Sequence, residues 1–565
     1  MAVQRFKLAL NAATFPLLST HASRSVCIPA LDGVARTPRT FMGSDENIDY
    51  NIPQIIYCEN VLPTRSGIKS VGYQQVIAPT VNNDFDSIFP LRDADENTVL
   101  YSPSHGKNYI YDDVLAAWST EDIPTIWGLT LAAGSVPADS KVTYAYVDGK
   151  TFVCYSRLQS TTAVDMSIMQ WDSVTKSLVP ATSIVTNLPF PVGEIDGISS
   201  SSGYLIVWSG LTIAWAPFNG AAFDYTIYAN GNFTGAGYQI PEDVQGPITA
   251  IIAMAGGFIA FTTRNAIGAS YHSQTITAPW VFREIPDAGG MDSYEQATVE
   301  GSLGRLIAYT TSGMQSLSLN SAELTFPAVS DFIASRSSER YDSGSHTIIP
   351  GSVSVDLFTK IAAVGNRYVV VSYGYYPGTF SYALVYDLGL KRWGKLRIVH
   401  RDCFYYTQKP TTAGLTYAML LDVSYAATTP DTYADTNVAP DRVTAAQHAL
   451  AFLRPTGEVV LGIWSDETRV EDAAVAIIGR IQLSRSSNVQ FNTVEVEGLK
   501  SGEVEIMPSY DGRTLATTEV LTTIAQHDDY RKAGSMIDCK NFNIIVEGTF
   551  DLSTIIIEGT TTGKF

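Results

Sequence analysis

The sequence has few charged residues, and acidic residues outnumber basic ones. Charged residues make up 16% of the 565 residues, against roughly 25% in an average globular protein, which favours a surface partly covered by neighbouring subunits. The 37 Lys and Arg against 56 Asp and Glu give a net charge of −19. This balance argues against a surface that holds nucleic acid by neutralising phosphates, but it does not exclude DNA that passes without binding.

Sequence signatures of disulfides, metal sites and catalysis are also missing. The five cysteines lie far apart and never form a Cys-x-x-Cys pair, so we interpret them as isolated thiols in a reducing compartment. There is no nucleophile elbow, zinc-protease helix motif or P-loop, and no pair of histidines has metal-ligand spacing. His400 beside Asp402 is interpreted as a loop contact. We therefore expect no enzyme, no metal and no cofactor.

Long apolar runs and helical periodicity are scarce. No apolar run reaches the ~18 residues of a membrane span, so we expect none. Met1–Ala22 carries Arg5 and Lys7 before an apolar run, but Pro16 interrupts that run and no small-residue cleavage site follows, so no signal peptide is expected. Only Asp112–Ala117 and Pro327–Ala334 favour a short helix.

What the sequence has in abundance is β-hairpins. Apolar, β-branched and aromatic runs flank tight turns at Asp148-Gly149, Ser209-Gly210, Gly256-Gly257, Ser312-Gly313 and Thr456-Gly457, and a further pair of runs is Arg367–Tyr373 with Ser381–Tyr386. Such turns need positive φ, which Gly adopts freely. The spacing between hairpins is uneven and close to that of a propeller blade of ~40–50 residues plus loops. We predict an all-β chain with an irregular β-propeller of about six or seven blades over residues 79–465.

One phrase recurs at the ends of these hairpins: an aromatic residue, then Asp, then a bulky apolar residue seven positions after the aromatic. The copies are Tyr111-Asp112 with Trp118, Trp171-Asp172 with Leu178, and Tyr386-Asp387 with Trp393. The alternating pattern places each aromatic on a buried strand face, and Asp opens a turn. We expect the bulky residue to begin the next strand, with Trp118 and Trp393 largely buried.

Three regions lie outside the repeats. Residues 1–78 contain the strand-like run Asn47–Ile56 and a Pro-Thr-Arg-x-Gly turn at Pro63–Gly67. Residues 424–447 are rich in Ala, Thr, Asp and Pro and predict a long loop. Residues 466–565 alternate apolar with polar residues, which predicts a separate C-terminal antiparallel β-sandwich, or platform. We expect the segment 1–78 to pair with this platform.

The order of these parts resembles the tail hub or nozzle proteins of short-tailed bacteriophages, including the packaged-DNA stabilisation type. The resemblance rests on Pro63–Gly67 ahead of the first blade, the Tyr-Asp hairpins that end in Trp, and Ser-x-Asp-Gly at Ser509–Gly512. It is most specific at Val61–Gly72, Gly365–Leu396 and Asn492–Glu558 and extends in layout over most of the chain. The uneven blade spacing and the 424–447 loop depart from the family pattern.

The resemblance implies a structural protein of the virion tail, made in the host cytoplasm. Six copies would form a ring below the portal or adaptor protein and would contact tail fibres or spikes. The ring would retain the packaged genome and conduct double-stranded DNA during ejection without binding it specifically. Acidic loops would repel the duplex within the ~8 Å screening length of physiological salt, and Asp93, Asp95, Glu96 and the 424–447 loop are candidates to face the channel.

Two alternatives stay open, a glycan-cleaving propeller of the sialidase or depolymerase kind and a glycan-binding or receptor-binding tail propeller without chemistry. The enzyme would need paired carboxylates and an Arg cluster that converge at the propeller axis. Ser509–Thr514 resembles half of the Asp-box turn of sialidase-like propellers, but Leu515 stands where the closing Trp belongs. A β-turn explains that segment fully.

Overall fold

The computed structural model describes the chain from residue 3 to residue 562 with gaps. The described residues are 3–11, 13, 15, 26–27, 54–71, 73–80, 87–92, 98–104, 107–112, 117–122, 142–156, 168–190, 194–272, 278–300, 305–324, 326–336, 339–342, 344, 347–349, 358–364, 368–374, 379–408, 447–462, 474–482, 488–508, 530–532, 538–539 and 542–562. Asp93, Asp95, Glu96, residues 424–446 and Ser509–Thr514 therefore lie outside the described residues.

The fold is all-β, as the sequence predicted, and α3 (Pro327–Arg336) is the one α-helix within the described ranges. Six separate four-stranded antiparallel sheets and a seventh set of four strands, which is part of a larger sheet, follow one another along the chain. The predicted turns have the required backbone, since Gly149, Gly256, Gly313 and Gly457 all have positive φ. Pro327 begins the helix, where its missing N–H costs no hydrogen bond.

The strands of the seven sets are short and regular. The first three sets are β7 (Phe89–Arg92), β8 (Thr98–Ser104), β9 (Lys107–Asp112) and β10 (Ala117–Asp122); β11 (Val142–Val147), β12 (Lys150–Tyr155), β13 (Ile168–Asp172) and β14 (Ser177–Pro180); and β16 (Gly197–Ser201), β17 (Tyr204–Ser209), β18 (Thr212–Pro217) and β22 (Gly237–Gln239). The next three are β23 (Ile248–Met254), β24 (Gly257–Thr262), β25 (Asn265–Tyr271) and β26 (Trp280–Gly289); β27 (Ala297–Glu300), β28 (Arg305–Thr310), β29 (Gly313–Ser318) and β30 (Ser321–Leu324); and β33 (Phe358–Val364), β34 (Tyr368–Gly374), β35 (Phe380–Asp387) and β36 (Arg392–His400). The last is β37 (Asp402–Gln408), β38 (Gln447–Leu453), β39 (Val459–Gly462) and β6 (Tyr73–Ala78).

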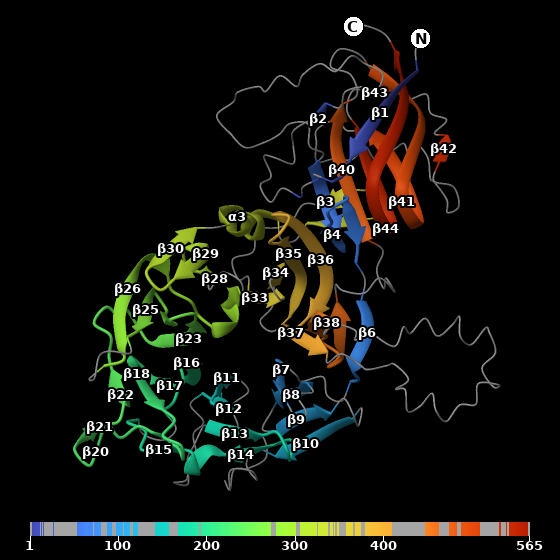
Figure 1. Cartoon of the computed structure of the whole chain (residues 1–565). Coiled ribbons are helices and arrows are strands. Elements are labelled where there is room, and N and C mark those ends of the chain that lie inside the picture. The colour runs from blue at the N-terminus through green and yellow to red at the C-terminus, as the bar shows by residue number, and fades with distance from the viewer. Residues whose placement is uncertain are drawn as a thin grey trace, which may run out of the picture.

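These seven sets form a closed circle, which we call the ring. The first strands of successive sets pack side by side from β11 through β16, β23, β27, β33 and β37 to β7. Phe89 on β7 closes the circle against Tyr144 on β11, with ring centroids 5.7 Å apart. Figure 1 shows the sets in chain order around a common centre. Apolar side chains of neighbouring sets fill the spaces between sheets, for example Trp208 and Phe258 in one shared cluster.

Strand β6 corrects one expectation from the sequence. Residues 1–78 were expected to pair with the C-terminal platform, but Tyr73–Ala78 pairs antiparallel with β39 and completes the last set of the ring. Without β6, the outer edge of β39 would present unpaired backbone groups. The two ends of the ring are thus joined by hydrogen bonds between strands almost four hundred residues apart in the sequence.

The C-terminal strands build a curled sheet above the ring, which we call the platform (Figure 1). Its strands are β40 (Ala474–Gln482), β41 (Asn488–Pro508) and β44 (Phe542–Thr562), with β1 (Val3–Ala9), β2 (Val26–Cys27), β3 (Gln54–Glu59), β42 (Tyr530–Lys532) and β43 (Asp538–Cys539). The long strand β44 is central, since β41, β40 and β1 all pair with it. Gly498, Gly502 and Gly548 have positive φ near the register shifts of this pairing, which bends both long strands.

The platform is not a separate sandwich, because its sheet continues into the ring. Strand β4 (Val61–Pro63) pairs with β36 of the ring, and β5 (Ile68–Ser70) pairs with both β4 and β44. The turn between β4 and β5 is the predicted Pro-Thr-Arg-x-Gly segment. A Cβ on Gly67 would lie 1.8 Å from the Leu552 carbonyl oxygen, so only glycine permits this approach of the two backbones.

The buried side chain of Arg392 on β36 also stabilises this junction between ring and platform. Its guanidinium donates hydrogen bonds to the carbonyl oxygens of Asn11 (2.8 Å), Thr64 (3.0 Å) and Gly67 (3.1 Å). Burial lowers the pKa of Arg392 to about 10, although Asp387 opposes this shift. A ring residue thereby holds three carbonyls of the N-terminal segment, which itself belongs to the platform sheet.

The recurring hairpin phrase always spans the third and fourth strands of a set. Each aromatic residue lies directly opposite the bulky residue seven positions later, in the pairs Tyr111 with Trp118, Trp171 with Leu178, and Tyr386 with Trp393. Asp172 and Asp387 open their turns by accepting backbone N–H groups of Val174 and Gly389, each at 2.9 Å. Asp112 accepts a hydrogen bond from Lys176 of the next set at 2.6 Å.

Neither of the two indoles lies mostly in solvent. Trp118 and Trp393 are partly buried, and both pack at the margins of apolar clusters. For Trp118 the remaining exposure follows from its place on the fourth strand of its set. This fourth strand, β10, is the edge of its sheet and has a neighbouring strand on one side only.

Candidate functional site

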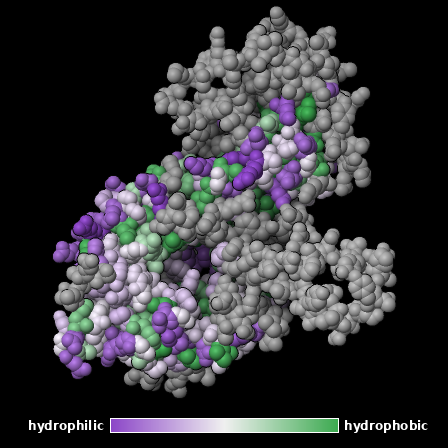
Figure 2. Space-filling model, viewed as in Figure 1, coloured by the Kyte–Doolittle hydropathy of each residue, from purple (hydrophilic) through white to green (hydrophobic). Residues whose placement is uncertain are grey.

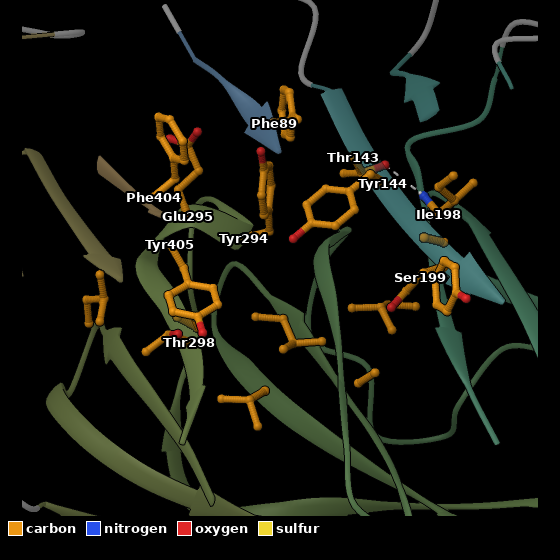
Figure 3. A pocket seen from close by; sticks show the side chains of 18 of the residues that line it. Phe89, Thr143, Tyr144, Ile198, Ser199, Tyr294, Glu295, Thr298, Phe404 and Tyr405 are labelled. Atoms are coloured by element: carbon orange, nitrogen blue, oxygen red, sulfur yellow. Dashed lines mark hydrogen bonds between the residues drawn. The ribbon is translucent and has the colours of Figure 1, made fainter. Parts of the chain in front are cut away.

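A cavity of 570 Å³ lies at the centre of the ring. Each of the seven sets contributes to its wall, through Phe89, Tyr144, Ser199, Ile252, Thr298, Lys360 and Cys403 among others. Figure 3 shows Phe89, Tyr144, Ser199 and Thr298 converging from different strands, and Figure 2 shows a hollow at the middle of the ring. A shallower cavity of 420 Å³ shares Tyr146, Ser200 and Ala253 with it, so the two are continuous.

An ion cluster forms one side of the cavity. Lys360 on β33 contacts Asp402 on β37 and lies 3.2 Å from Glu295 of the short helix η2 (Tyr294–Gln296). The second carboxylate oxygen of Asp402 accepts the backbone N–H of Ile88 at 2.8 Å, immediately before β7. The cluster therefore connects the sixth set (β33), the last set (β37), the segment before the first set (Ile88) and the short helix η2 before the fifth set.

One ammonium group serves two carboxylates in this cluster. Burial alone would lower the pKa of Lys360, but Asp402 and then Glu295 outweigh it and raise the pKa above its ordinary value, so Lys360 is a cation at neutral pH. Burial raises the pKa of Asp402, and Lys360 opposes this shift. Both carboxylates line the cavity, and Glu295, whose side chain is 32% exposed against 1% for Asp402, is the more open of the two.

His400 belongs to a separate hydrogen-bonded chain behind the cavity wall. Its Nδ1 lies 2.8 Å from the Ile398 carbonyl oxygen and its Nε2 lies 2.8 Å from Ser372 Oγ. Because a carbonyl can only accept, Nδ1 carries the proton, and Nε2 accepts a hydrogen bond from the Ser372 hydroxyl. Cys403 Sγ lies 3.3 Å from Ser372 Oγ and therefore donates to it. Asp402 bonds other groups, so His400 and Asp402 form no dyad.

The sequence-derived residues and the cavity do not coincide. Tyr111, Trp171 and Tyr386 and their partners lie on outer hairpins of the first, second and sixth sets. The cavity residues come from all seven sets and from η2, at distant positions in the sequence, and no local motif marks them. Asp93, Asp95 and Glu96 fall outside the described residues, so their place relative to any channel stays a hypothesis.

Metal sites and membrane spans were sought over the same described ranges. No group of His, Cys, Asp and Glu there is arranged to hold a metal ion. Cys58, Cys154 and Cys403 are buried. None of the helices in the described part of the chain is long and apolar enough to cross a membrane.

Comparisons with known proteins give only weak likenesses. No protein-family model and no curated protein matches the chain. The extracellular domain of a B. thetaiotaomicron protein described as a one component system matches with a TM-score of 0.38 and 10% identity, over 90% of this chain and 62% of that domain. A chain from the S. cerevisiae complex of Dbp5 with Nup159 and Gle1 matches with a TM-score of 0.31 and 9% identity, over 72% of this chain and 97% of the other.

A third structure, KlHsv2 with a Gly-Ser linker in place of loop 6CD, matches with a TM-score of 0.27 and 11% identity, over 56% of this chain and 97% of that one. This chain therefore spans 62% of the length of the first structure that it matches. At these TM-scores, none of the three likenesses carries an argument about fold or function.

Removing the cation of the ion cluster should strongly destabilise the ring. In Lys360→Met, Asp402 and Glu295 would lose the cation that they share, and we expect the free energy of unfolding to fall by about 3–5 kcal/mol. Chemical denaturation measures the change. Arg305→Met is the matched control, because its ion pair with Glu323 is exposed and should be worth at most ~1 kcal/mol. Equal small losses in both variants would show that the cluster does not hold the ring together.

His400 should make the protein sensitive to mild acid. Burial lowers the pKa of His400 from 6.5 to about 4, so the folded state binds this proton less readily than the unfolded state. The stability it contributes is complete above pH 6.5 and is lost as the pH falls through 4, by about 3 kcal/mol in all. His400→Gln should flatten this part of the stability profile, whereas His272→Gln, at an exposed position, should leave it unchanged. An unaltered profile in His400→Gln would contradict the assignment.

Proposed function

We propose that this chain is a structural subunit of a short-tailed phage virion, a tail nozzle or hub whose copies surround the DNA channel below the portal or adaptor. In this proposal the seven four-stranded sets are the blades of a β-propeller, and the curled sheet above them is the assembly platform. The observation that carries it is the unbroken sheet from β33–β36 through β4 and β5 to β44. It joins two bodies of one chain at a fixed angle.

A channel part that must stay aligned while DNA passes requires its two bodies to be held at a fixed angle. Domains that meet only through a flexible linker move relative to one another by default. Here, strand pairing on both sides of β4 and β5 and three hydrogen bonds from Arg392 replace such a linker. Glu59 of β3 adds an ion pair to Arg397 of β36 at 3.2 Å. An enzyme or adhesin of two independent modules would not need this connection.

The DNA of this proposal passes between copies and not through the ring. A turn of duplex is about 34 Å long and wider than its ~12 Å major groove, so it would fill several times the 570 Å³ of the central cavity. The channel must therefore lie on the symmetry axis of several chains. A net charge of −19 per chain would keep the duplex from adhering to its wall, since affinity for DNA comes chiefly from neutralised phosphates.

Assembly into a ring of subunits follows from the same proposal. Head-to-tail contacts close by cyclic symmetry, and a stable contact would bury well over ~1,000 Å². The count of six comes from the family resemblance. The platform and the N-terminal strands would form this ring and face the adaptor, with the propellers projecting outward towards fibres or spikes.

The glycan-cleaving alternative has one specific observation in its favour. Two carboxylates, Glu295 and Asp402, converge on the central cavity, and retaining glycosidases use a pair about 5–5.5 Å apart. Both carboxylates, however, contact the ammonium group of Lys360, and no Arg is among the described residues that line the cavity. Asp402 is enclosed, with a side chain only 1% exposed, and a substrate would find no Arg among the described lining residues, so the structural proposal is the better supported one.

Imaging the particle that contains this chain tests the proposal. Cryo-electron microscopy of the purified virion should show copies of the chain around the tail axis, with an open channel at the centre. A chain found elsewhere in the particle, or present as a single copy, would end the conduit proposal. Cleavage of a chromogenic glycoside by the purified chain would favour the enzyme instead.

A solution measurement checks passage without binding. Fluorescence anisotropy of a labelled duplex with the purified chain should show no binding tighter than the ~10⁻⁴ M limit of non-specific association, at both 50 mM and 200 mM salt. Affinity in the micromolar range that falls steeply with salt would contradict a non-adhesive channel wall.

A further inference from the structure

The central cavity has the size and walls of a small-molecule site. Ligand pockets usually measure about 300–1,000 Å³, and this one has 570 Å³. Aromatic rings from three sets, Phe89, Tyr144 and Phe404, line it together with Tyr294 of η2, and Figure 3 shows Phe89, Tyr144 and Tyr294 close together around one space. Tyr144 keeps 48% of its surface exposed, so a solute can reach the aromatic wall.

The electrostatics of the cavity favour one sign of ligand charge. Lys360 supplies one positive charge against the negative charges of Asp402 and Glu295, and Glu295 is the most exposed of the three. The neighbouring Tyr294 responds to the same field: burial raises its pKa, and Glu295 and Asp402 raise it further. A cation entering this space would therefore meet aromatic faces and Glu295, the more exposed of the two carboxylates that share Lys360.

We propose that the central cavity binds a small organic cation with an ammonium head group. Aromatic faces attract such cations through their quadrupoles, and this attraction strengthens where water is displaced. Glu295 supplies the opposite charge: it also accepts from Lys360 at 3.2 Å, but its 32% exposure leaves it open to a cation. A neutral sugar would find two hydroxyls already engaged, because Ser200 donates to the Tyr146 carbonyl and the Thr143 oxygen accepts from the Ile198 N–H. The inference does not depend on the proposed tail function, since the cavity lies within a single chain.

Calorimetric titration of the full-length chain with choline tests the proposal. Choline should bind at one site per chain, and 3,3-dimethylbutan-1-ol, its uncharged analogue of the same shape, should bind at least about tenfold more weakly. This comparison uses the unaltered protein, so it does not depend on any variant folding. Equal affinity for the two probes, or no binding of choline, would overturn the proposal.

Two variants with matched controls assign the site. Glu295→Gln should weaken choline binding at least about tenfold, because it removes the more exposed carboxylate of the cluster and leaves Lys360 with Asp402. Tyr144→Ala should also weaken it by removing an aromatic face. Glu323→Gln and Tyr228→Ala, at exposed positions outside the cavity, should bind choline like the unaltered chain. Unchanged binding in both cavity variants would place the cation elsewhere and overturn the assignment, as would tighter binding of galactose than of choline.

Discussion

Strand pairing across β4 and β5 is the constraint on which the arrangement of this molecule depends. These two short strands have a ring strand, β36, on one side and the platform strand β44 on the other. The approach is close enough that Gly67 has no room for a Cβ, and the buried Arg392 of the ring binds carbonyls of the N-terminal segment. Because buried backbone groups must keep their hydrogen bonds, the two bodies cannot separate without losing this ladder.

The ring is held by contacts of a different kind. Strand β6 closes its last sheet, and the Lys360 cluster connects sets on both sides of that closure. A charged cluster with apolar and aromatic neighbours leaves a cavity fit for a small solute and too small for a duplex. The proposed DNA channel is therefore a property of several chains, whereas the proposed cation site is a property of one. The two proposals can fail independently.

Local chemistry made much of the fold predictable, and long-range contacts made the rest unpredictable. Turns that need positive φ, such as Asp148-Gly149, indicate their hairpins in the sequence. Asp387 indicates its turn because its carboxylate accepts a backbone N–H of that turn. By contrast, Lys360, Asp402 and Glu295 come from three distant segments, and nothing near any of them in the sequence indicates the others. The insertion of β6 beside β39 was missed for the same reason. The partial exposure of Trp118 depends on β10 being a sheet edge, which an alternating pattern does not reveal.

The most direct measurement of the central claim is native-state hydrogen exchange at the junction. If ring and platform form one rigid body, the paired amides of β4 and β5 should exchange only through openings as costly as those that expose the centres of β34 and β44. Exchange of β4 and β5 at a much lower free energy than both neighbours would show a hinge at this point. A hinge would contradict the fixed geometry on which the proposed channel subunit rests.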